Sequence, residues 1–322
     1  MKKIKIFVSF FVLGGIALSC NAAKAGESVI PVTPPGGTDL YQAILPPSGL
    51  YGIALALPYN QSSHLYDKDG HAVPAEDNLS IDLPFVAGGL LYVYPFKVFG
   101  GKLASSYITS YWDLNYKIGG RMSKHETGLA DSYSDIFYWS KNLGLAGVVP
   151  GLKPLPYGLT MALGYAMDIP TGVYNPKNPI NPGHNLWVAV PNAAITYVTG
   201  PNMSFGDSTE VSARVFYGMP FQNGTTGYQS GNIVDVDFSG AERFGRLQLG
   251  LVGYYTTQVT DDSRKNGIPV PNGGRYTELH LGPILSYDIR PGWVVKAKYY
   301  QDVVARSAIN ENSFAVSMTF AF

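Results

Sequence analysis

The chain has 322 residues, of which 46% are hydrophobic and 14% charged, well below the roughly 25% charged residues of ordinary soluble domains. Its 23 basic and 23 acidic residues cancel, so the basic excess that a nucleic-acid partner requires is missing. The single cysteine, Cys20, lies near the N-terminus. The rest of the chain therefore has no disulfide, thiolate metal site or cysteine nucleophile.

The first 25 residues are typical of a secretory signal peptide. Three lysines precede an apolar run, and small residues around Ala25 provide a cleavage site before Gly26. A membrane anchor is one alternative, because residues 6–23 are uncharged and just reach spanning length. Lipid attachment at Cys20 is another, on an imperfect cleavage box. Cleavage would remove four lysines and leave 23 − 4 = 19 basic against 23 acidic residues, so we predict an exported, mildly acidic product.

Residues 26–49 contain five prolines and no regular apolar spacing. Such a segment is expected to be extended and to stay outside any sheet. Two alternatives follow for its place in the fold. It is either an inert tail or a plug that folds into the domain formed by residues 50–322, with its apolar side chains inside, namely Leu40, Tyr41, Ile44 and Leu45.

From residue 50 onward, apolar side chains recur at every second position, which is the spacing of a β-strand. The last segment is the clearest, because Phe314, Val316, Met318 and Phe320 alternate with small or weakly polar residues up to Phe322. Twelve such segments follow one another in the chain, at 50–57, 83–95, 102–115, 131–143, 158–169, 185–199, 208–220, 228–239, 246–260, 274–288, 292–301 and 312–322.

Most of these segments have about 9–14 residues, whereas strands of soluble sandwiches have about 5–6. Aromatic residues lie near the ends of the apolar faces, as in Trp187 to Tyr197 and Trp293 to Tyr299. Membrane-spanning strands need about 9–11 residues and have aromatic girdles at both interfaces. We therefore predict an all-β fold, a transmembrane up-and-down antiparallel β-barrel of about twelve strands, with ten or fourteen strands and a soluble all-β domain as alternatives.

The connections between these segments give the barrel a direction. If both termini are periplasmic, the outward loops are the longer set, as in outer-membrane barrels. Among the inward connections, 289–291 is a tight turn, and only 144–157 breaks the rule. We expect the C-terminal strand, which ends on Phe322, to be recognised by the barrel-assembly machinery.

Several short motifs occur in a fixed order between residues 94 and 306. They are Tyr94-Pro95, Gly100-Gly101, GHNLW at 183–187, NGTTGYQSG at 223–231, GYY at 253–255, Asp261-Asp262, Gly282-Pro283, KYY at 298–300 and Arg306. Together they resemble the outer-membrane family associated with the meta-cleavage pathway of phenol degradation. One departure is Ile309-Asn310, where the family more often has glycine. The resemblance implies an outer-membrane barrel that passes hydrophobic or aromatic compounds, similar in role to the fatty-acid and toluene channels.

Charged and polar residues on several strands fall on the face opposite the apolar one. We predict that they line the lumen, because Arg or Lys on the lipid face would cost about 2–4 kcal/mol at the midplane. They either brace the wall or line the path of a solute. Twelve strands enclose little more than their own side chains, so a narrow or gated path is expected. The predicted lumen residues are Glu210, Arg214, Asp235, Asp237, Glu278, His280, Lys296 and Lys298.

Four further residues are candidates to contact an aromatic solute through stacking or hydrogen bonds. They are Tyr228 and Gln229 on the predicted segment 228–239, and Tyr107 with Tyr111 on the segment 102–115. The chain contains 23 tyrosines. A bracing or interfacial role is therefore the alternative for each of these tyrosines.

Catalysis requires a nucleophile beside a base, and Ser63-His64 is the one adjacent Ser/His pair of the sequence. The same loop contains Asp67, Asp69 and His71, which together with His64 are the types of residue that hold divalent cations. An irregular loop fixes no such geometry, and we predict no enzyme activity, metal or cofactor. The prediction is an outer-membrane channel for small hydrophobic or aromatic compounds, in contact with membrane lipid. A non-conducting structural or surface-exposed barrel is the alternative.

Overall fold

The structure, a computed structural model, describes residues 31, 35–75, 77–144, 157–200, 204–270 and 273–322. The predicted signal peptide with Cys20, and most of the inward connection 144–157, lie outside these residues. The described residues form strands joined by turns and loops, with a single turn of 3-10 helix, η1 (Lys265–Gly267). None of their helical segments is long and apolar enough to cross a bilayer.

Within the described residues, twelve long strands form one antiparallel sheet in which neighbours in sequence are neighbours in space. This simple order arises because successive two-faced segments are joined by turns or single loops. The strands are β1 (Gly49–Ser62), β3 (Phe85–Val98), β4 (Gly101–Ile118), β6 (Ser132–Asn142), β7 (Gly158–Ile169), β8 (Val188–Val198), β9 (Ser208–Pro220), β10 (Ile233–Phe244), β11 (Leu247–Gln258), β14 (Thr277–Arg290), β15 (Trp293–Arg306) and β16 (Asn312–Ala321).

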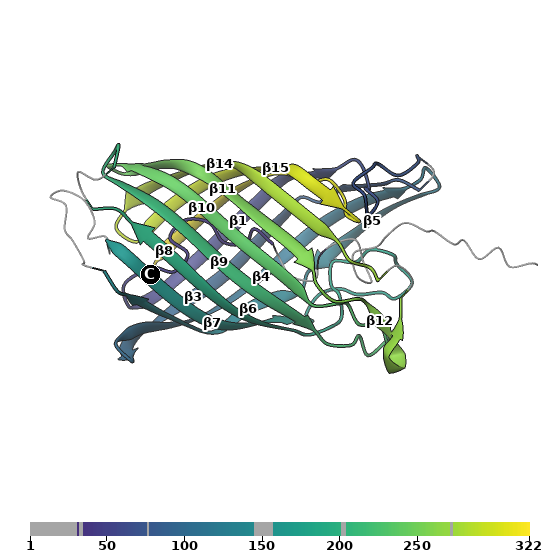
Figure 1. Cartoon of the computed structure of the whole chain (residues 1–322), viewed down its shortest axis with the longest axis horizontal. Helices are drawn as coiled ribbons and strands as arrows, with labels where there is room; N and C mark the ends of the chain where they lie inside the picture. Colours follow the sequence, from purple (N-terminus) through teal and green to yellow (C-terminus); the bar gives the residue numbers. More distant parts are fainter. Residues whose placement is uncertain (1–30, 32–34, 76, 145–156, 201–203, 271–272) are drawn as a thin grey trace, which may run out of the picture.

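The first and last strands close the sheet into a barrel. Strand β16 pairs antiparallel with β1, from Tyr51 opposite Ala321 to Gln61 opposite Asn312. Figure 1 shows the tilted strands around the barrel, with the C-terminus at the end opposite the β12 hairpin. Closure leaves the twelve long strands of the described chain without an unpaired edge, which a hydrocarbon environment would not tolerate. The predicted fold class, an antiparallel barrel of twelve strands, is confirmed.

Four short strands extend the outward end. Strand β2 (Leu79–Asp82) pairs with β1 and β4, and β5 (Met122–Leu129) pairs with the outer part of β4. A small hairpin of β12 (Ser263–Arg264) and β13 (Ile268–Pro269) lies in a loop. We expected loops at these positions. A strand outside the membrane needs no alternation of apolar and polar residues. The sequences of these segments therefore lack the period-two pattern from which strands were predicted.

The two faces of the wall differ in chemistry, as the alternation predicted. On β9, Val211 and Val215 are exposed on the outer face, whereas Glu210, Ser212 and Arg214 are buried inside. This arrangement is the reverse of a soluble protein, because the outer face of a membrane barrel contacts hydrocarbon and the lumen is polar.

Most predicted strand bounds agree with the structure within a few residues, but β10 does not. We expected residues 228–239, whereas the strand runs from Ile233 to Phe244. The preceding residues are held in a loop, where Asp262 Oδ1 accepts a hydrogen bond from the Gly231 N–H at 2.7 Å. Strands β1 and β15 extend about five residues beyond their predicted ends, because they continue where the apolar pattern stops.

Candidate functional site

The lumen of the barrel contains the N-terminal part of the described chain. Residues 36–46, which we call the inner segment, are hydrogen-bonded to side chains of the surrounding strands, and Figure 1 shows the purple start of the chain inside the barrel. Leu40, Ala43 and Leu45 are buried. Of the two arrangements expected for residues 26–49, the described part is folded inward.

Asp237 of β10 holds the beginning of the inner segment. Its Oδ1 accepts a hydrogen bond from the Gly36 N–H at 2.8 Å, and its Oδ2 accepts from the Thr38 N–H at 2.7 Å and the Thr38 hydroxyl at 2.6 Å. Gly36 has a φ of +69°, and a Cβ there would lie 2.5 Å from the Tyr254 ring. Glycine is therefore required at this position by both backbone conformation and space.

The rest of the inner segment is held from other sides of the barrel. Its backbone N–H groups donate to Glu210 of β9 and Thr196 of β8. Its carbonyl groups accept from Tyr138 and Ser140 of β6 and from Lys102 of β4. A segment without regular secondary structure must find partners for its buried backbone groups, and the polar lumen side chains are those partners.

Asp39 is the only charged residue of the inner segment. It forms ion pairs with Lys296 and Lys298 of β15, the latter at 3.7 Å, and Lys298 also donates to the Gly36 carbonyl at 2.9 Å. Burial alone would raise the pKa of Asp39, but the two lysines outweigh it and hold the pKa below its ordinary value of 3.8. The carboxylate is therefore ionised at neutral pH.

Arg214 forms a second network, on the opposite part of the wall. Its guanidinium donates to Asp135 Oδ1 at 2.7 Å and to the side-chain oxygen of Asn192 at 2.9 Å. It also lies over the rings of Tyr138 and Phe216, at 4.4 and 4.6 Å from their centroids. Such a paired and stacked arginine links strands β6, β8 and β9 across the lumen.

The predicted lumen residues fall into two groups. Glu210, Asp237, Lys296 and Lys298 contact the inner segment, and Arg214 braces the wall beside it. The others lie farther toward the outward end of the barrel, on β10 and β14, namely Asp235, Glu278 and His280.

Two of the four candidate contacts to an aromatic solute lie outside the strand on which the sequence placed them. Tyr228 and Gln229 lie in the loop before β10, where the Tyr228 hydroxyl donates to Asp262 at 2.5 Å and Gln229 pairs with Ser263. Tyr107 and Tyr111 lie on β4, as expected, and are exposed on its outer face. Tyr228 and Gln229 were predicted to be in a strand because the predicted start of β10 was five residues too early. Tyr107 and Tyr111 belong to the apolar face of β4.

Sequence reasoning missed several residues that contact the inner segment or its neighbours. Arg243 donates to the Tyr41 hydroxyl at 3.2 Å and to Asp288 at 2.9 Å. Arg243 lies in β10 beyond residue 239, where the apolar alternation predicts the end of that strand. Asp39 offered one usable signal, since it is the only Asp, Glu, Lys or Arg between residues 28 and 66.

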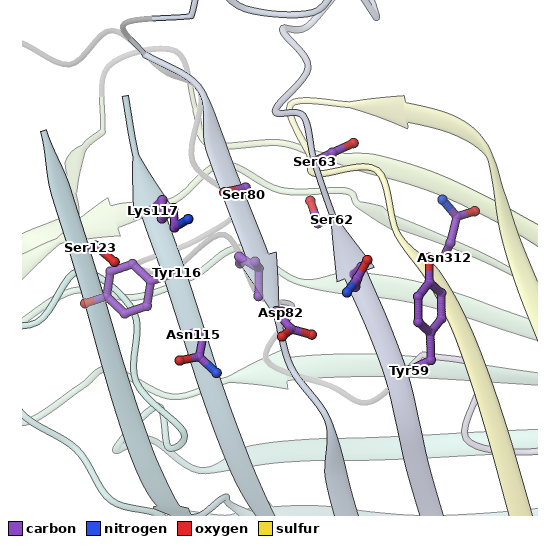
Figure 2. Close-up of a pocket in the computed structure, with 12 residues that line it drawn as sticks. Tyr59, Ser62, Ser63, Ser80, Asp82, Asn115, Tyr116, Lys117, Ser123 and Asn312 are labelled. Atoms are coloured by element: carbon purple, nitrogen blue, oxygen red, sulfur yellow. The ribbon is translucent and has the colours of Figure 1, made fainter. Parts of the chain in front are cut away.

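A polar hollow of about 390 Å³ lies on the outer face of the barrel near its outward end. Asn312, Gln61, Asp82 and Asn115 are direct neighbours on β16, β1, β2 and β4 and form one row across it. Figure 2 shows Tyr59 and the labelled members of this row pointing to the same side. Tyr59 pairs with Phe314 directly below the row, so the hollow marks the upper boundary of the apolar outer face.

The outward loop that contains Ser63 and His64 is held by local hydrogen bonds. The Ser63 hydroxyl is 2.8 Å from His64 Nδ1, and both residues are exposed. Asp67 Oδ1 accepts backbone N–H bonds from Asp69 and His71, as in a turn. Across the described ranges, no group of three or more His, Cys, Asp or Glu residues is arranged to hold a metal ion.

Comparison with solved structures gives the class of the protein. The COG4313 outer membrane channel from Pseudomonas putida F1 has a TM-score of 0.70 and 14% identity, over 90% of this chain and 100% of that chain. The β domain of the Bordetella autotransporter BrkA has a TM-score of 0.45 and 13% identity, over 86% of this chain and 100% of that chain. The class is that of closed twelve-stranded barrels with the fold of an outer-membrane channel.

Comparison of sequences gives the family. The model of the family described as "Putative MetA-pathway of phenol degradation" matches residues 62–318. The chain belongs to this family. No curated protein sequence matches the chain.

Proposed function

We propose that the protein is an outer-membrane channel through which small hydrophobic or aromatic compounds diffuse passively. The fold of an outer-membrane channel and the phenol-degradation family both support this function. The observation that carries the proposal is the inner segment. It narrows the lumen, yet hydrogen bonds and ion pairs to side chains attach it to the wall without any covalent link. Such contacts exchange with water when the segment moves, so the path is gated and not sealed.

A non-conducting structural barrel is the second candidate. The contacts between the inner segment and the wall favour this candidate if they never break. The segment is held from six strands, namely β4, β6, β8, β9, β10 and β15. The distinction is therefore one of transport, and it requires a measurement on cells.

Entry of labelled phenol or toluene into intact cells tests the channel. Cells that lack the gene should take up the solute more slowly than cells with it, whereas lysates of both should metabolise the solute equally. A sugar of similar size serves as the control solute, and its uptake should not change. Equal entry of the aromatic solute with and without the protein would favour the non-conducting barrel.

Localisation is a separate proposal, with membrane lipid as the environment of the apolar outer face and the barrel-assembly machinery as the partner of β16. Fractionation of cells should place the mature chain, cleaved near Ala25, in the outer membrane. Recovery from the soluble periplasm would contradict both the location and the channel function.

A further inference from the structure

Four carboxyl groups gather in the outward half of the lumen, beyond the inner segment. Asp235 of β10 lies within electrostatic range of Glu278 of β14, and Glu278 within range of Asp302 and Glu311. Asp235 and Glu278 are buried, and the other two are half-buried. On β15, Asp302 lies four residues outward of Lys298, which is already paired with Asp39.

No opposite charge balances this cluster within the structure. Among the described residues, no lysine or arginine lies within 4 Å of Asp235, Glu278, Asp302 or Glu311. Like charges that share a buried site repel one another and raise the cost of ionisation. Glu311 lies just before β16, outside the membrane-spanning strands. Its burial, and after that the neighbouring Asp302, raise the pKa of Glu311 to about 7. A bound cation would relieve this repulsion.

His280 provides an independent indication of a ligand. Its side chain is 0% exposed, and neither ring nitrogen has a hydrogen-bond partner. The backbone of Glu311 lies beside the ring without reaching hydrogen-bonding geometry. A parallel stack with Tyr254, at 4.4 Å between centroids, fixes the ring, and Nε2 lies 3.9 Å from Asp302 Oδ1.

The unpartnered atoms are mostly acceptors of hydrogen bonds, since of the two imidazole nitrogens one accepts and the other carries an N–H. They include Oδ1 of Asp302 and Oδ1 of Asp235 as well as the imidazole. A buried polar atom without a partner costs about 1–3 kcal/mol. A ligand for this site therefore has several N–H donors and a positive charge.

We propose that these residues bind the ammonium group of a small organic amine. An ammonium has three N–H donors, which complement the carboxylates and the accepting nitrogen of His280. Tyr254, which is stacked on His280, forms an edge-to-face pair with Tyr300 at 5.2 Å, so the surroundings of the acidic groups are aromatic, as suits an organic cation. A metal ion fits less well, because the described acidic and histidine residues do not form a metal-binding group.

This inference goes beyond the proposed function and does not depend on conduction, because the site would bind its ligand in a barrel that conducts nothing. The probe is phenethylammonium chloride, titrated calorimetrically into the full-length mature protein in detergent at neutral pH. The neutral alcohol 2-phenylethanol has the same ring and chain length but no charge. Saturable binding of the ammonium, at least about tenfold tighter than the alcohol, is expected.

Two variants locate the site. Glu278→Gln and Asp302→Asn keep the side-chain shape but remove a charge, and each should weaken binding of the ammonium by about tenfold or more. Asp82→Asn, a matched change on the outer face of β2, should leave binding unchanged. Equal affinity for ammonium and alcohol would overturn the proposal even if both lumen variants failed to assemble. Unchanged binding in the two assembled variants would also overturn it. Neither result bears on the uptake of neutral aromatics.

Discussion

At the scale of single residues, Asp39 decides how the inner segment is held. A segment without secondary structure is held mainly by single hydrogen bonds to its backbone groups. The carboxylate of Asp39 adds two ion pairs, with Lys296 and Lys298, that attach the segment to β15. The attraction is strong because Asp39 lies in the lumen, away from bulk water. An exposed pair such as Asp261 with Arg275 contributes little by comparison.

We predict that Asp39→Asn lowers the free energy that holds the inner segment in the lumen by roughly 2–3 kcal/mol, because Lys296 and Lys298 lose their charged partner. The loss is below that of a fully buried pair because Lys296 is partly solvated. A chain that begins at Gly26 has no cysteine, so Ala43→Cys in that chain, at a fully buried position, reports release through maleimide labelling. Labelling should be faster with Asp39→Asn and unchanged with the control Asp261→Asn. Equal labelling in all three backgrounds would show that Asp39 is not the anchor.

The pH dependence of the same contact follows from the lowered pKa of Asp39. A carboxylate whose pKa is lower in the folded state stabilises the fold above its ordinary pKa, and this contribution is lost as pH falls through the lowered value. Labelling of Ala43→Cys with a dipyridyl disulfide, which reacts with thiols in acid where maleimide does not, should therefore stay slow from neutral pH down to about pH 4 and increase only in stronger acid. An increase already between pH 5 and 6 would contradict this assignment.

At the scale of elements, each strand has a hydrocarbon face and a lumen face, and β16 shows both. Val316 is exposed on the outer face, whereas Ser317 is directly opposite Lys296 on the lumen face. Because the side-chain period of a strand is two, a shift of one residue moves a substitution from one face to the other. Neighbouring positions therefore test the assignment of the faces.

We predict that Val316→Asp destabilises the assembled barrel by up to about 2 kcal/mol, because a carboxylate enters the apolar belt. The matched change Ser317→Asp places the same group beside Lys296 and should be tolerated. The heat-dependent gel shift of the folded barrel, with urea unfolding in lipid vesicles, measures both. Equal stability of the two variants would mean that the faces are assigned wrongly.

At the scale of the whole molecule, the barrel and the inner segment are separable. The seam between β16 and β1 begins at Tyr51, after the inner segment ends, and the sheet closes through backbone pairing alone. The inner segment adds no strand to the wall. It contributes side-chain contacts inside a lumen that exists without it.

We predict that deletion of residues 27–45 leaves a barrel that assembles and has a larger and steadier conductance in planar bilayers. Lys296 and Lys298 would then face water and remain solvated. The intact protein measured under the same conditions is the control. If the shortened chain assembles but conducts no more than the intact one, the inner segment does not obstruct the path.

The sequence predicted some site residues and missed others for identifiable reasons. Glu210 and Arg214 lie in the middle of a long alternating segment, where the phase is unambiguous. Tyr228 and Arg243 lie near opposite ends of β10, where a displacement of five residues moved one into a strand and the other into a turn. Strand ends beyond the apolar belt carry no alternation, so their bounds depend on loop contacts such as that between Gly231 and Asp262.

The sequence by itself determined the barrel class, the strand order and the face of most side chains, because contact with lipid imposes a period of two that is visible residue by residue. Only the tertiary structure decided where residues 36–46 lie and which charges meet. Asp39 and Lys296 are 257 residues apart, and no local pattern encodes such a pair. Closure of the sheet brings the lumen faces of all strands around one narrow space, and that space determines the partners.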